Sequence, residues 1–109
     1  MKPIILLLIL FSFVVISCSS SDDSPTLTNV TYTGDIKFII DDNCLNCHGN
    51  PTANGAPMFL TTYDEVKEAV INRGLIDRIK DGSMPPTGTP LTDLQVQAIK
   101  DWKTANYPQ

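Results

Sequence analysis

Basic residues and histidine are scarce in this chain. Eight Lys and Arg stand against twelve Asp and Glu, which gives a formal charge of −4 at pH 7. Because phosphate groups are bound by clustered Lys and Arg, this balance argues against a nucleic-acid partner. The single histidine, His48, also restricts the metal sites that the chain can build.

No apolar run is long enough to cross a bilayer. The longest one, Ile4 to Ile16, spans thirteen positions with Ser12 inside it, whereas a transmembrane helix needs roughly twenty apolar residues. Lys2 precedes the run, and a short positive segment followed by a short apolar one is typical of an export signal. The pattern therefore excludes a membrane-spanning bundle and predicts a leader that directs the chain out of the cytoplasm.

The leader ends in Val15-Ile16-Ser17-Cys18, which resembles the lipobox of bacterial lipoproteins: an aliphatic residue, a small residue and then cysteine. The resemblance implies that residues 1–17 are removed, that Cys18 is lipidated, and that the chain is anchored in the cell envelope. Ser19 after the cysteine favours the outer membrane, or otherwise a periplasmic face. Two or three acyl chains anchor a protein stably, because each buried CH₂ contributes about 0.8 kcal/mol. The alternative is an ordinary signal peptide followed by a chance cysteine.

Beyond the leader, apolar residues are also scarce. Of the 92 residues from Cys18 onward, 33 are apolar. A small domain with so few apolar residues usually needs a metal, disulfides or another cross-link to be stable. Residues 18–29 are mostly small, polar and acidic, so they bury too little apolar surface to fold and are predicted to be a flexible tether. The folded domain is expected at residues 30–109.

Helix-period patterns, without strand alternation, predict an all-α domain. Ile36, Ile39 and Ile40 share one face of the first predicted helix, which Thr33 would cap. The predicted helices are Thr33–Asp42, Tyr63–Arg73, Leu75–Lys80 and Thr92–Asn106.

Two capping boxes and one glycine set the boundaries of the later helices. Thr62 pairs with Glu65, and Thr92 pairs with Gln95, so that each side chain bonds an otherwise unpaired amide of a first helical turn. Gly74 stands where a helix would end in a left-handed residue.

The run Cys44-Leu45-Asn46-Cys47-His48 has the spacing of a haem c attachment signature. Its two thiols can add across the two vinyl groups of one haem edge, and the adjacent histidine can bind the iron. A structural zinc site would need four ligands, and once Cys18 is lipidated only Cys44, Cys47 and His48 remain. A thioredoxin-like cysteine pair would sit in a βαβ unit, a pattern that this sequence lacks. A disulfide between such close cysteines would close too short a loop to stabilise much. The motif therefore predicts one haem c, held covalently through Cys44 and Cys47, with His48 on the iron.

Residues 30–109 resemble a small monohaem cytochrome c. The resemblance rests on CLNCHG after the first helix, a middle helix, a GSMPPTG loop, and AIKDW in the last helix. It implies a cytochrome c-like fold, in which about four short helices wrap around the haem and the terminal helices cross. The isoleucines of the first helix would then meet Ile99 and Trp102. It also implies that Met84, in the GSMPPTG loop, is the second axial ligand.

Met58 is the alternative second ligand. It lies only ten residues after His48, which leaves little chain to reach the opposite face of a haem. Met84 lies thirty-six residues after His48, beside two prolines that stiffen its loop. Residues 58–60 are instead expected to pack on the ring.

Iron that is bound by both His and Met has no open coordination site. The expected function is therefore electron transfer between redox partner proteins rather than catalysis, and no other group of residues resembles a catalytic site. Two alternatives stay open. The domain could be a haem-based sensor or ligand-binding module in which a small gas displaces Met84, or an accessory electron-entry subunit of a dehydrogenase.

Two further side chains have candidate roles beside the haem. Arg78 could contact a haem propionate, because a guanidinium group matches the geometry of a carboxylate. Trp102 could cap the haem edge, but packing between the terminal helices is the favoured interpretation.

Overall fold

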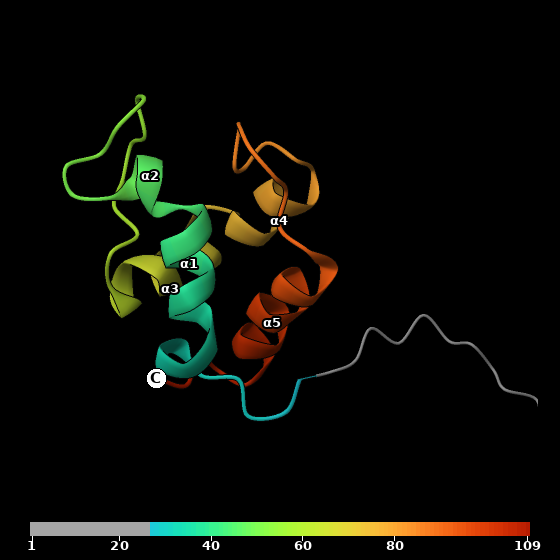
Figure 1. Cartoon of the computed structure of the whole chain (residues 1–109). Helices are drawn as coiled ribbons and strands as arrows, with labels where there is room; N and C mark the ends of the chain where they lie inside the picture. The colour runs from blue at the N-terminus through green and yellow to red at the C-terminus, as the bar shows by residue number, and fades with distance from the viewer. Residues whose placement is uncertain (1–26) are drawn as a thin grey trace, which may run out of the picture.

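In the computed structural model, which describes residues 27–109, the regular structure is all helical (Figure 1). The elements are η1 (Tyr32–Ile36), α1 (Lys37–Asn43), α2 (Leu45–His48), α3 (Tyr63–Asn72), α4 (Leu75–Lys80) and α5 (Asp93–Thr104). The predicted all-α class is confirmed. The predicted leader, Cys18 and most of the predicted tether lie outside the described residues. Within that described part, no helix has the length and apolar character that a bilayer span requires.

The first helix begins earlier than predicted, because Thr31 caps it and Thr33 does not. The Thr31 hydroxyl accepts a hydrogen bond from the Gly34 amide at 3.0 Å. The Asp35 carboxylate in turn accepts one from the Thr31 amide at 2.9 Å. This reciprocal pair closes a π-helical turn, η1, which continues directly into α1.

The two predicted capping boxes and the predicted glycine stop are confirmed. Thr62 and Glu65 open α3, and Thr92 and Gln95 open α5, each with both reciprocal hydrogen bonds present. Gly74 has a φ of 64° in the left-handed region and separates α3 from α4. A side chain at Gly74 would be strained there, which explains the glycine.

Four aromatic residues gather at one end of the domain, in a cluster we call the packed base (Tyr32, Tyr63, Trp102 and Tyr107). Trp102 is completely buried, and its ring centroid lies 4.9 Å from that of Tyr107 and 5.9 Å from those of Tyr32 and Tyr63. The Trp102 indole N–H donates a hydrogen bond to the Pro108 carbonyl at 2.8 Å. The expected packing role of Trp102 is confirmed.

The first and last helical elements meet, as predicted. η1 packs against α5, and Ile36, Ile40 and Ile99 are inaccessible to solvent or nearly so. The Tyr32 amide also donates to the Pro108 carbonyl at 2.9 Å, so the C-terminal residues close over the start of the first helix.

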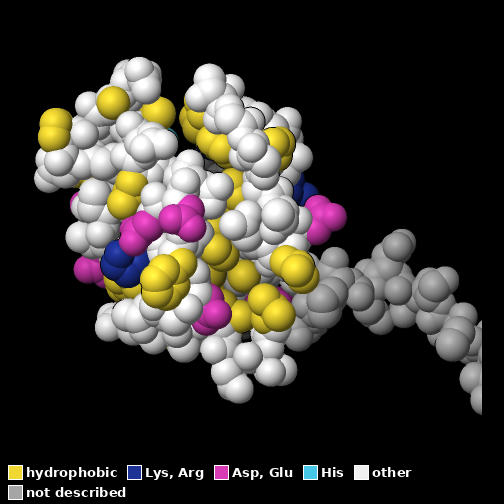
Figure 2. All heavy atoms as spheres, in the orientation of Figure 1, with side chains coloured by type: hydrophobic (Ala, Val, Ile, Leu, Met, Phe, Trp, Pro, Cys, Tyr) yellow, Lys and Arg dark blue, Asp and Glu magenta, His cyan; other side chains and the backbone are white. Residues whose placement is uncertain are grey.

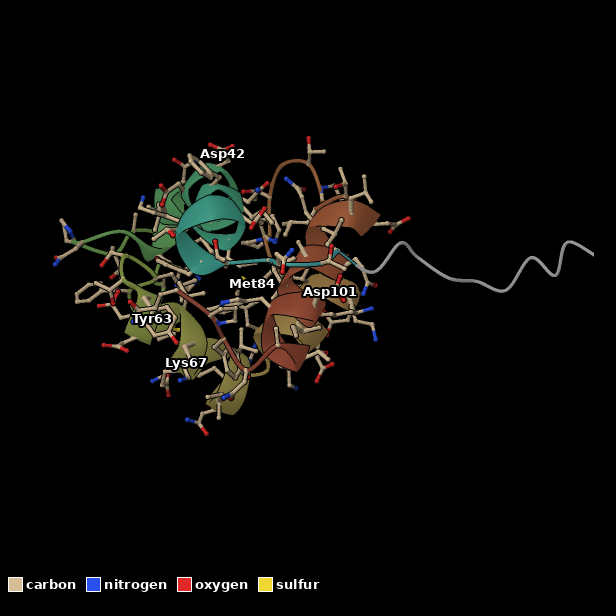
Figure 3. All side chains as sticks on the ribbon, turned by 90° about the horizontal axis from the view of Figure 1, so that it is seen from below. Asp42, Tyr63, Lys67, Met84 and Asp101 are labelled. Atoms are coloured by element: carbon tan, nitrogen blue, oxygen red, sulfur yellow. The ribbon has the colours of Figure 1, made fainter. Side chains whose placement is uncertain are left out.

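Asp101 holds the beginning of the described chain against α5. One of its carboxylate oxygens accepts a hydrogen bond from the Leu27 amide at 2.7 Å, and the other accepts one from the Gln97 side chain at 2.8 Å. The Asp101 residue is only 8% exposed. Figure 3, which views the domain from the base, shows Asp101 on α5 beside the incoming chain.

Candidate haem site

A cavity of about 380 Å³ is lined mainly by residues of α2, α4 and the loops beside them. Figure 1 shows α2 and α4 at the end of the domain away from the packed base. Cofactor sites typically measure about 300–1,000 Å³ and have mostly apolar walls. Figure 2 shows a notch between the two upper parts of the molecule, with hydrophobic side chains along its rim. The residues that line the cavity are Asn43, Cys44, Cys47, His48, Pro57, Met58, Leu60, Asn72, Arg73, Leu75, Arg78, Ile79, Met84, Pro85, Pro86 and Leu91.

The helical turn α2 brings the attachment motif to the wall of this cavity. The amides of Cys47 and His48 both donate to the Cys44 carbonyl, at 3.2 and 2.9 Å. The turn therefore sets both thiols and the imidazole on one side of a single coil of backbone. Gly49 follows the turn in an extended conformation, and a Cβ at that position would lie 2.8 Å from the Leu45 carbonyl oxygen, which explains the glycine.

His48 is buried, and its tautomer is fixed by a backbone contact. Its Nδ1 lies 2.9 Å from the Met58 carbonyl oxygen, and a carbonyl can only accept, so Nδ1 carries the proton. The other ring nitrogen, Nε2, is left with a lone pair to give to a metal. A hydrogen bond of this kind orients a ligating histidine.

The two attachment thiols are unpaired and line the same cavity as His48. Burial raises the pKa of the Cys44 thiol to about 11, so it stays neutral in its apolar surroundings. The Cys47 sulfur accepts a contact from the Asn54 side-chain amide at 3.4 Å. Two unpaired thiols and an oriented imidazole beside a largely apolar cavity fit a haem that is covalently attached.

Met84 reaches the cavity from the loop that follows α4. Its amide donates to the Arg78 carbonyl at 3.0 Å, which holds the loop against the end of the helix. The Ser83 amide donates to the Asp81 carboxylate at 2.8 Å, and the hydrogen bonds from Ser83 lower the pKa of Asp81. In the view from the base, Met84 projects near the middle of the domain and not at its rim (Figure 3).

Most of the residues expected around the haem line this cavity, but Phe59 does not. Met58 and Leu60 do line it, whereas Phe59 is 40% exposed and lines a shallow hollow on the outside of the domain. The expected packing of Phe59 on the ring is therefore wrong, because its side chain lies on the outside of the domain and does not line the cavity.

Two contributors to the site were not predicted. The Met58 carbonyl fixes the His48 tautomer, and no side-chain pattern encodes a backbone contact of that kind. Arg73 lines the cavity together with Arg78. The signal for Arg73 was its place at the end of the predicted helix Tyr63–Arg73, five residues before Arg78.

This arrangement of a C-x-x-C-H turn on a largely apolar cavity, inside an all-α domain, defines a c-type cytochrome. The model of the family described as cytochrome c oxidase, cbb3-type, subunit III matches residues 35–102. The chain belongs to this family, and the match includes both the attachment motif and Met84. Searches of curated proteins and of solved structures found no significant match.

The domain is therefore a small monohaem cytochrome c, an electron carrier and not an enzyme. Its haem c is covalent, and Cys44, Cys47 and His48 form the attachment motif. When bound, the haem supplies an iron that cycles between ferrous and ferric states. The protein positions that iron, excludes water from it and meets its redox partner proteins.

Proposed function

We propose that this domain transfers electrons with His48 and Met84 as its two axial ligands, while anchored to a membrane through lipid on Cys18. The observation that carries the ligand assignment is the shared cavity. His48, with its Nδ1 proton held by a carbonyl, and Met84, held by the end of α4, line it from different elements. Ligation by both residues occupies both axial positions of the iron, and a methionine sulfur ligand favours a high reduction potential.

Met84 is favoured over Met58 because of what each backbone does. The Met58 carbonyl is committed to His48, so Met58 belongs to the wall that the histidine occupies. Met84 comes from a segment beyond α4 and is followed by two prolines that restrict its conformation. A loop restricted in this way loses less entropy when the sulfur is fixed on iron.

The ligand assignment is tested by Met84→Ala, with Met58→Ala as the matched control. Met84→Ala should keep the covalent haem, lose the red absorption band of ferric iron bound to sulfur, lower the potential and gain affinity for carbon monoxide. Met58→Ala should keep that band. Loss of the band in Met58→Ala and its survival in Met84→Ala would reverse the assignment. Carbon monoxide binding by the unaltered protein would favour the sensor alternative.

The anchor proposal rests on the lipobox-like motif before Cys18, and it places the domain in the cell envelope. Cys18→Ser should abolish labelling by a radioactive fatty acid and release the cytochrome from the membrane fraction, with its haem spectrum unchanged. Cys18→Ser protein that stays bound to membranes, or wild-type protein that takes up no label, would contradict lipid anchoring.

A further inference from the structure

The cavity has an unexpected charge for so acidic a chain. Arg73 and Arg78 line it, and none of the residues that line it is Asp, Glu or Lys. These are the two arginines of the sequence, and none of the five lysines within residues 27–109 lines the cavity. Two guanidinium groups without a carboxylate among the lining residues form a wall suited to a ligand with negative charge.

The two arginines are linked to each other through backbone. Arg73 is the C-cap residue directly after α3, and its amide donates to the Ala69 carbonyl at 3.1 Å. Its own carbonyl accepts a hydrogen bond from Nε of Arg78 at 3.2 Å. The end of α3 therefore helps to position the arginine that α4 supplies.

Glu68 holds Arg73 from the other side. One Glu68 carboxylate oxygen lies 3.0 Å from Nε of Arg73. Arg73 lines both the cavity and the shallow outer hollow, whereas Glu68 lines the outer hollow alone. With Nε engaged by Glu68, the four remaining N–H donors of Arg73 are available to other acceptors.

We propose that Arg73 and Arg78 form a two-arginine subsite for the carboxylate groups of the haem, and that Glu68 tunes the haem potential by sharing Arg73. The proposal rests on the haem assignment and adds Arg73 and Glu68 to the candidate contact at Arg78. Positive charge near a haem favours the reduced state, which carries one more electron. Partial neutralisation of Arg73 by Glu68 opposes this effect.

The test is potentiometry of the holoprotein at low ionic strength, with charge-matched controls. Arg73→Gln and Arg78→Gln should each lower the midpoint potential, and Glu68→Gln should raise it. Lys80→Gln removes a positive charge from α4 outside the cavity and should leave the potential nearly unchanged. Asp64→Asn is the corresponding control for Glu68, because Asp64 lies on α3 and lines the outer hollow only.

A double variant separates tuning through Arg73 from a general charge effect. If Glu68 acts through Arg73, Glu68→Gln should shift the potential less in an Arg73→Gln background than in the wild type. Arg73→Lys, which keeps the charge but loses the planar fork, should fall between wild type and Arg73→Gln.

The proposal is overturned if Lys80→Gln lowers the potential as much as Arg73→Gln, or if neither arginine variant shifts it. Additive shifts of Glu68→Gln and Arg73→Gln would remove the tuning role of Glu68. The sulfur-to-iron band should be unchanged in all of these variants. A wrong assignment of Met84 as ligand would be seen in that band. The failure of the ligand assignment can therefore be distinguished from the failure of this subsite.

Discussion

The two ends of this domain are built in different ways. At the packed base, four aromatic rings contact one another, and hydrogen bonds from Trp102 and Tyr32 converge on the Pro108 carbonyl. At the other end, the walls formed by α2, α4 and their loops face each other across a cavity of about 380 Å³. The base is completed by the chain's own side chains, whereas the open end is completed by the haem. Cooperative folding of a domain with so few apolar residues should depend on both.

Of the changes that test this difference between the two ends, removal of the covalent haem should have the largest effect on stability. Cys44→Ala combined with Cys47→Ala deletes both attachment thiols, so the open end loses the group that its walls pack against. We expect the domain to be largely unfolded, with little cooperative melting by circular dichroism. Cys18→Ser is the control, because it removes a cysteine and keeps the attachment motif. Native helicity and a cooperative melt without haem would show that the base suffices.

Damage to the base should be large but should not alter the iron. Trp102→Ala leaves a cavity among three tyrosines, and substitutions of this kind cost about 3–5 kcal/mol of stability. Denaturant titration should show that loss, while the axial-ligand spectrum of the folded fraction stays unchanged. Phe38→Ala is a matched control, because Phe38 is 61% exposed and its loss should hardly change stability. A changed sulfur-to-iron band in Trp102→Ala would mean that the two ends are coupled more tightly than their contacts indicate.

A smaller effect should come from pH, through the cap of α3. Hydrogen bonds from the Thr61 hydroxyl and from the amides of Thr61 and Thr62 lower the pKa of Glu65 from its ordinary 4.5. The pKa of Glu65 is lower in the folded state than in the unfolded state, so its hydrogen bonds stabilise the fold. This stabilisation is fully present above the unfolded-state pKa and is lost as pH falls through the folded-state pKa.

Thermal melting below pH 4.5 should therefore depend less on pH in Glu65→Gln than in the wild type. The equivalent residue of the α5 box is Gln95, which does not titrate, so Gln95→Ala should lower stability equally at every pH. Identical pH profiles for Glu65→Gln and the wild type would contradict the role of this carboxylate.

The smallest effect should be on the rate of electron exchange with charged redox probes at the open end. From Cys18 onward, seven basic and twelve acidic residues give a formal charge of −5. We expect a small cationic redox probe to exchange electrons faster at low ionic strength than at high, and an anionic probe to do the reverse, as salt shortens the Debye length. The opposite pattern would show that local positive charge around the cavity overrides the charge of the whole domain.

Helix boundaries could be predicted wherever side chains set them. Thr62 with Glu65, Thr92 with Gln95, and Gly74 all signal ends that the structure has within one or two residues. The turn α2 has four residues and no apolar period, so its pattern is too short to read. The Thr31 cap was missed because its partner, Asp35, lies four positions on, one beyond the spacing of the usual capping box.

The attachment motif could be predicted from the sequence, whereas the contacts around it could not. C-x-x-C-H is a local motif, so Cys44, Cys47 and His48 could be identified directly. The Met58 carbonyl, Arg73 and the outward turn of Phe59 depend on how separate segments come together, and local spacing holds no information on that.

The hydrogen bond between the Leu27 amide and the buried Asp101 carboxylate also has a mechanical consequence. A pull on the residues that precede Leu27 is transmitted to α5 and the packed base, at the end of the domain opposite the cavity. Tension that enters at Leu27 therefore acts on α5, the helix that carries Trp102, through this hydrogen bond as well as along the chain that leads into η1.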